Sequence, residues 1–289
     1  MSPVGSQRTA AEIEPPTFRK PPVVEVALAV QWDAPRFDAL QIAEFGRRLH
    51  DRYPTREEQV ARPPMQEEFG LPERPLQFQL EILDRPPSQR FWFLTTDGSH
   101  LIQVQADLVA VNWRRTLDGS DYPRYPALRE QARESLDVIE AILKDEGSTP
   151  LKPSWCEVTY INHIAPSGGD ETERPPLHRV LVGIASPQSS VLPPPEDRQL
   201  IDRFVIRDND HPAGRVHVSA VPAFRTEDRT PIYVLTLTAR LRAKAPDVEG
   251  ALGALDRGRE LLDRAFMEMT TPEMHQRWEL QEADEHVAR

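Results

Sequence analysis

VVEVALAVQW, residues 23–32, and WCEVTYINHI, residues 155–164, are the two stretches that decide the fold of this chain. In each stretch apolar side chains recur at every second position, which is typical of a β-strand. The two align when Glu157 is placed on Glu25, so that each carries a Glu-Val pair at the same place. The alignment predicts two similar strands, each of which opens one half of the chain.

The same order of elements is expected after each of these strands. Apolar residues spaced near 3.6 mark the helices, and Asp97-Gly98 marks a hairpin turn. The first half is expected to continue with a helix, three strands and a helix at 37–49, 76–83, 91–95, 101–113 and 126–147. The second half is expected to continue in the same order at 177–184, 203–207, 215–225, 232–242 and 248–269, before a short helix at 271–278.

These elements predict an α+β protein built from a duplicated unit of strand, helix, three antiparallel strands and helix. The expected boundaries are a disordered tail at 1–20, a first unit at 21–150, a second unit at 151–280 and a tail at 281–289. Because unpaired sheet edges invite aggregation, we expect the two sheets to join into one curved sheet with helices on one face. Packing of the units as separate domains is the alternative.

The composition excludes several classes of protein. Among 289 residues there are 46 acids and 35 bases, and the net charge of −11 disfavours binding to a nucleic-acid backbone. A single cysteine, Cys156, forms neither an intramolecular disulfide nor a multi-cysteine zinc site and suits a reducing compartment. No stretch has the roughly 18 apolar residues of a membrane span, and residues 1–20 do not resemble a signal peptide. We therefore expect a cytoplasmic protein that does not bind membranes.

The motifs of common enzyme classes are absent from the sequence, including the Walker loop, GxGxxG, HExxH and GxSxG. The weak catalytic candidates are Glu25 and Glu157, because a carboxylate inside an apolar strand has to be solvated, paired or hydrogen-bonded. A pseudo-twofold axis would bring the two together as an acid/base pair or a cation site. The alternative is that each is paired with an arginine, such as Arg114 or Arg240, or with backbone amides.

The densest polar and aromatic run in the chain lies at 103–125. Amides, guanidinium groups and phenols are what a pocket for an anionic or planar ligand would use. The candidate ligand-binding residues, including one from the second opening strand, are Gln103, Gln105, Asn112, Arg114, Arg124 and Asn162. Alternatively, this run is a structural corner before the helix at Pro126, with Trp113 covering the core.

Other polar residues indicate structure rather than chemistry. Residues 208–211 read Asp-Asn-Asp-His, which are cation ligands in type but also good turn formers between two strands. His163 and His217 have no second histidine at ligand spacing, and Cys156 reads as a small buried apolar residue. We expect no metal and no cofactor.

Five motifs spread along the chain occur together. They are KPPVVEV at 20–26, IQVQ at 102–105 leading to NWR at 112–114, YPRY at 122–125, EVTYIN at 157–162, and a late stretch from His275 to Trp278. Together they resemble a sporadically distributed bacterial family of conserved proteins, over residues 18–280. The family has no assigned activity, so the resemblance implies no catalytic residue. Its scattered distribution implies genetic neighbours in defence or mobile-element modules. This chain departs from the family in its short, proline-rich helix at 177–185.

The leading hypothesis is a non-enzymatic binding or regulatory protein that recognises a small molecule or a protein partner through the sheet face or a central cleft. The acidic surface would suit a basic protein partner. The first alternative is an enzyme that uses Glu25 and Glu157 as an acid/base pair. The second is a structural subunit of an assembly, and homodimer formation is open in each case.

Overall fold

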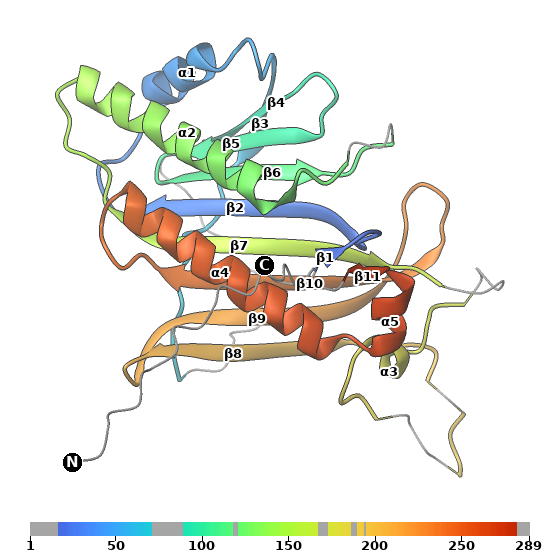
Figure 1. Ribbon diagram of the computed structural model, residues 1–289. Coiled ribbons are helices and arrows are strands. Elements are labelled where there is room, and N and C mark those ends of the chain that lie inside the picture. The colour runs from blue at the N-terminus through green and yellow to red at the C-terminus, as the bar shows by residue number, and fades with distance from the viewer. Residues whose placement is uncertain are drawn as a thin grey trace, which may run out of the picture.

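A computed structural model describes residues 17–70, 89–117, 121–166, 173–185, 190–193 and 195–281. In these residues nine strands form one sheet in the order β3-β4-β5-β6-β2-β7-β10-β9-β8, and all neighbours are antiparallel (Figure 1). The strands are β2 (Val23–Trp32), β3 (Thr55–Val60), β4 (Gln89–Leu94), β5 (His100–Gln105), β6 (Leu108–Arg114), β7 (Pro153–Ile164), β8 (Leu200–Asp208), β9 (His211–Phe224) and β10 (Pro231–Arg242). The predicted α+β class and the joined sheet are confirmed.

Three helices cover one face of the sheet, as Figure 1 shows. They are α1 (Ala39–Arg48), α2 (Arg124–Asp145) and α4 (Val248–Met269). α1 begins with a capping box, in which Asp38 accepts from the Gln41 backbone N–H and the Gln41 side chain accepts from the Asp38 backbone. α4 packs on β7 and β10, whereas α2 packs on β6 and β2. The short helices α3 (Leu177–Val180) and α5 (Pro272–Arg277) pack against each other.

The alternation of side chains in β2 separates the two faces. Val26, Leu28 and Trp32 point to the helices, and each is at most 1% exposed. Ala29 and Gln31 point to the opposite face, where Ala29 packs with Met65. Full burial of one such aliphatic side chain contributes about 1.5–3 kcal/mol, so the helix-covered layer is the main core.

β2 and β7 pair at the middle of the sheet, and their register is symmetrical about Ala27 and Thr159. Read outward from this centre, β6, β5 and β4 follow β2 just as β10, β9 and β8 follow β7. The arrangement has the form expected for two similar units. Duplication of one ancestral unit stays a prediction.

Several predicted boundaries differ from the structure. The segment 101–113, expected as one strand, is the hairpin of β5 and β6, and the helix expected at 177–184 is the single turn α3. β3 was not predicted, because TREEQV is exposed along most of its length and carries no apolar alternation. The strand expected at 76–83 lies outside the described residues.

Residues 17–20, expected as the end of a disordered tail, have defined structure. Thr17–Phe18 forms β1, which pairs with β11 (Leu280–Gln281) in a small second sheet. Phe18 is only 7% exposed and packs edge-on against Trp278 and Phe266. The start of the described chain is therefore part of the core, because a buried ring anchors it. The rest of the predicted tails, residues 1–16 and 282–289, lies outside the described residues.

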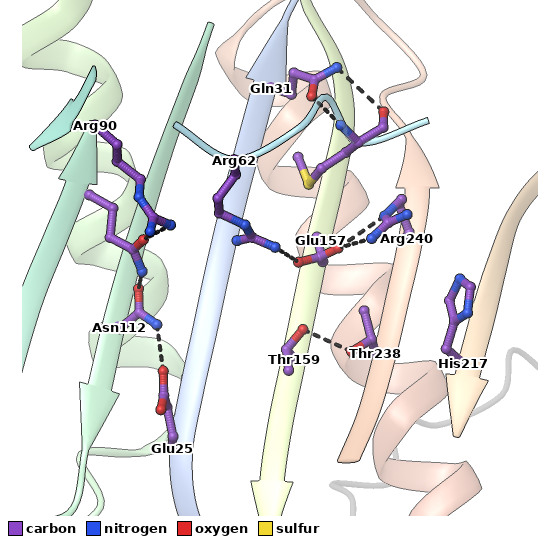
Figure 2. Close-up of polar contacts among 12 residues, drawn as sticks. Glu25, Gln31, Arg62, Arg90, Asn112, Glu157, Thr159, His217, Thr238 and Arg240 are labelled. Carbon is purple, nitrogen blue, oxygen red and sulfur yellow. Dashed lines mark hydrogen bonds and ion pairs between the residues drawn. The ribbon is translucent and has the colours of Figure 1, made fainter. Parts of the chain in front are cut away.

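Residues 61–70, here called the strap, cross the face of the sheet opposite the helices (Figure 2). Two glutamine side chains bind the strap, and each makes a pair of hydrogen bonds to the backbone of one residue, as a neighbouring strand would. The Gln31 side chain accepts from the backbone N–H of Met65 and donates to its carbonyl, and Gln105 does the same with the backbone of Arg62. We call this side of the sheet the strap face.

Candidate functional site

A cavity of about 570 Å³ lies between the helix layer and the centre of the sheet. Its walls come from β1, β7, β10, α4 and the start of α2. Five aromatic side chains line it: Phe18, Tyr122, Tyr125, Tyr160 and Phe266. The polar lining residues are Thr17, Arg124, Asn162, Arg259 and Asp263. A concave, mostly apolar site of this size with a few polar groups is typical of small-molecule binding.

The spacing of the polar residues along their strands and helices explains why their side chains lie at the cavity. Tyr160 and Asn162 alternate along β7, so both side chains lie on the helix-covered face. Arg259 and Asp263 are four residues apart on α4 and so share one face of that helix. Arg124 begins α2 with a left-handed backbone (φ 66°), which is uncommon for a residue with a side chain. Its guanidinium donates to the carbonyl of Phe18.

Asp263 is the most perturbed carboxyl in the cavity. Burial raises its pKa to about 6, although the nearby Arg259 guanidinium opposes this change. The Nε atom of Arg259 lies 2.7 Å from Oδ2 of Asp263. A carboxyl with a pKa of about 6 changes its charge near neutral pH, which is a common property of functional sites.

Two phenol hydroxyls face each other beside this ion pair. The hydroxyl oxygens of Tyr122 and Tyr160 are 3.5 Å apart, at the limit of a hydrogen bond. Burial raises the pKa of both phenols, so both are neutral donors at physiological pH. Each can therefore give a hydrogen bond to a ligand.

Asn162 brings a buried amide to the cavity. Its side chain is 3% exposed, and Nδ2 donates to the backbone carbonyl of Leu235. Oδ1 has no hydrogen-bond partner among the described residues. An amide oxygen that lines a cavity can accept a hydrogen bond from a ligand donor.

A separate ion pair fixes the part of the cavity wall where α2 and α4 meet. Asp256 of α4 accepts from the Tyr125 hydroxyl at 2.8 Å and from the Arg129 guanidinium at 2.7 and 2.9 Å. This bidentate contact joins α2 to α4. The contact with Asp256 fixes the position of Tyr125 in the cavity wall and uses the proton of its hydroxyl, so Tyr125 does not donate to a ligand.

On the strap face, a chain of hydrogen bonds crosses four neighbouring strands (Figure 2). Arg90 donates to Gln103, Gln103 donates to Asn112, and Asn112 donates to Glu25. The chain begins at a cation and ends at a carboxylate, and each amide in it both accepts and donates. It accounts for the burial of Gln103 and Asn112 without a ligand.

Glu157 lies further along the same face and is held by two arginines. Its carboxylate accepts from Arg240 at 2.6 Å and lies 3.3 Å from Nη2 of Arg62 in the strap (Figure 2). Arg240 also donates to Glu67 of the strap, which contacts Arg215 as well. This is a buried ionic network whose role is to hold the strap on the sheet.

The structure divides the predicted site residues between the two faces. Arg124 and Asn162 line the cavity. Gln103, Gln105 and Asn112 lie on the strap face in structural hydrogen bonds, and Arg114 donates to the carbonyl of Gly98 in the hairpin turn. The six candidates therefore do not share one pocket, because alternate positions of a strand face opposite sides, and their role in binding a ligand stays a prediction.

Glu25 and Glu157, the weak catalytic candidates, do not lie together. Glu25 is opposite Ile161, and Glu157 is opposite Ala29. Four positions along β2 separate the two carboxylates by roughly 13 Å. Symmetry about Ala27 and Thr159 places them on opposite sides of the centre, so they cannot act on one atom.

Sequence reasoning missed the acid and the base that α4 contributes to the cavity. Arg259 and Asp263 interrupt the side of α4 that carries Leu262 and Phe266, and all four line the cavity. The sequence signal that could have identified them is an acid and a base four residues apart beside the apolar stripe of the helix.

The 208–211 segment is the turn between β8 and β9, where Asn209 and Asp210 have a left-handed backbone.

Within the described residues, no group of three or more His, Cys, Asp or Glu side chains is arranged to hold a metal ion. None of the helices in the same residues has the length and apolar character needed to cross a membrane.

No protein-family model matches this chain, and neither the curated proteins nor the solved structures gave a significant match. The family resemblance of the sequence motifs therefore stays a prediction.

Proposed function

We propose that this protein is a non-enzymatic binding protein that holds a small molecule in the cavity between α4, the start of α2 and the centre of the sheet. The observation that carries the proposal is the cavity itself. It has a volume of about 570 Å³, is lined by five aromatic side chains, and includes the half-buried Asp263 carboxyl, whose pKa is raised. A concave site of this size with apolar walls and a few polar groups is typical of sites that bind small molecules.

The polar groups support binding rather than turnover. The strap face, where the sequence suggested catalysis, has its carboxylates roughly 13 Å apart and engaged with structural partners. In the cavity, Tyr160 and Asn162 lie on a strand, and Arg124, Arg259 and Asp263 lie on long helices, which suits a recognition site. The single cysteine is consistent with action in the cytoplasm. A protein partner and a homodimer stay predictions.

A thermal-shift screen of the full chain against small planar metabolites tests the proposal. Binding of a ligand raises Tm as the ligand exceeds its dissociation constant. Hits are then titrated by calorimetry against two variants of α4. Met267→Trp fills the cavity, because Met267 lines it; Met269→Trp is the matched control, because Met269 is also half-buried but lies outside the lining.

We expect Met267→Trp to weaken binding of a hit at least about ten-fold and Met269→Trp to leave it unchanged. A screen without hits would contradict the proposal. A hit that both variants bind as well as the wild-type chain would move the site away from the cavity.

A further inference from the structure

We propose that the ligand of this cavity is an aromatic carboxylic acid, whose carboxylate is bound by Arg259 with help from Tyr122 and Tyr160. This inference rests on the proposed function and names the class of ligand. It is carried by the charges, donors and rings that line the cavity.

The charge of the lining is opposite to the charge of the protein. Two cations, Arg124 and Arg259, face one anion, Asp263, and no other charged residue among the described ones lines the cavity. The chain as a whole carries a net charge of −11. A site that is locally positive on an acidic protein favours an anionic group over a cationic one.

Hydrogen-bond donors also line the cavity near these charged residues. The hydroxyls of Tyr122 and Tyr160 have no partner in the described residues besides each other. α2, a helix of 22 residues, begins at the cavity with Arg124, and its N-cap Pro123 gives no side-chain hydrogen bond. The backbone N–H groups of a helix start carry positive partial charge and favour an anion.

In the structure the Asp263 carboxylate is bound to Arg259, where we propose that the carboxylate of the ligand binds. The charged and titratable groups that face it are Arg259 and Glu260 on α4, Tyr160 on β7 and Tyr122 before α2. Its contact with Arg259 shows that a carboxylate fits against this guanidinium. Because burial holds the pKa of Asp263 at about 6, it becomes neutral in mild acid, and Arg259 is then free for the ligand.

The rest of the lining suits an aromatic body. Phe18 and Phe266 meet edge to face, with centroids 5.7 Å apart, and both line the cavity. The apolar residues Val23 and Leu237 form the floor on the sheet. Aromatic rings pack well in such offset and edge-on surroundings. The Asn162 amide oxygen offers an acceptor for a ring N–H.

Three probes that share one ring and differ in charge test the inference: indole-3-acetate, indole-3-acetamide and tryptamine. Calorimetry with the full chain is expected to give affinity for the acetate about ten-fold above the amide, with tryptamine weakest. The affinity for the acetate should rise as the pH falls from about 7 to about 5.5, because Asp263 becomes protonated. Equal or tighter binding of tryptamine, or binding of none of the three, would overturn the inference.

Two variants locate the charge effect. Arg259→Gln should lower affinity for the acetate on the order of ten-fold and change amide binding little. Asp263→Asn should raise affinity for the acetate and remove its pH dependence. Arg264→Gln, at an exposed arginine of the same helix, is the control and should change nothing. An unchanged pH profile in Asp263→Asn would contradict the role given to Asp263.

The two proposals fail in different ways. If tryptamine binds best and Met267→Trp abolishes its binding, the cavity is a ligand site and only the carboxylate is wrong. If no small molecule from the wider screen binds, the proposed function itself fails.

Discussion

Ala27 and Thr159 face each other at the centre of the pairing between β2 and β7, and the register of the two strands is symmetrical about them. Glu25 and Glu157 lie two residues to either side of this centre. In antiparallel strands that are related by such a centre, the distance between equivalent residues increases with their distance from the centre. The symmetry that suggests a shared site is therefore what separates the two carboxylates.

Double-mutant cycles on the strap face should reflect this separation. Glu25→Gln and Glu157→Gln should have additive effects on the free energy of unfolding, within about 0.5 kcal/mol, because the residues share no partner. Glu67→Gln and Glu157→Gln should be coupled, because both carboxylates bind Arg240. Urea unfolding of the single and double variants measures both. Strong coupling between Glu25 and Glu157 would contradict the separation.

Glu67 should be the most sensitive residue of the strap. Its side chain is 2% exposed and contacts Arg215, Arg240 and His217. Glu67→Gln removes the charge and should lower the free energy of unfolding by about 3 kcal/mol, because it leaves the buried Arg215 guanidinium without a counter-charge. Glu58→Gln, on the exposed edge strand β3, is the matched control and should change it by less than about 0.5 kcal/mol.

The same ion pairs predict acid sensitivity. Burial of Glu67 opposes ionisation, but His217, Arg240 and Arg215 outweigh it, so the pKa of Glu67 is lowered. A lowered folded-state pKa stabilises the protein above the pKa of the unfolded chain, roughly 4.3, and the stabilisation is lost as the pH falls further. Unfolding free energies measured between neutral and acidic pH should therefore converge for wild type and Glu67→Gln. A constant difference would argue against the charge as the cause.

Cys156 should be protected from thiol reagents in the folded protein. It is 2% exposed, and burial raises the pKa of its thiol to about 12. The thiolate is the reactive form, so labelling should proceed only through opening of the structure. The labelling rate with a chromogenic disulfide should rise steeply with urea, in step with unfolding. Rapid labelling without denaturant would show that β7 is accessible in the native state.

Two helical glycines offer a matched pair. A Cβ at Gly46 of α1 would overlap the Phe93 ring, with Cζ at 2.9 Å, whereas a Cβ at Gly253 of α4 would have nothing within 4 Å. Gly46→Ala should lower Tm, because overpacking costs about 1–3 kcal/mol. Gly253→Ala should raise the free energy of unfolding by about 0.5–1 kcal/mol, because alanine favours the helix. Equal shifts in both would mean that α1 does not pack closely on β4.

Elements with a strong local period could be predicted from the sequence. β2, β7 and α4 each repeat an apolar pattern over ten or more residues, and all three are where the pattern placed them. β3 has almost no buried side chain, so its sequence carries no trace of pairing. The turn between β5 and β6, at Ala106-Asp107, has no glycine, and the two strands therefore read as one.

The candidate site could be predicted only in part. Arg124 and Asn162 were selected from their surroundings in the sequence, and both line the cavity. Glu157 and Asn162 are five positions apart on β7, and an odd spacing places side chains on opposite faces. The strap, which engages Gln105 and Glu157, comes from residues far away in the chain.

The sequence by itself determined the class of the fold, the two central strands and the long helices, because these depend on the spacing of neighbouring residues. Only the tertiary structure decided where the cavity lies. Phe18, Tyr122, Tyr160 and Asp263 meet there although each is between 38 and 104 positions from the next along the chain. No local pattern records such a meeting, because it results from the pairing of β2 with β7 and the packing of α4 across them.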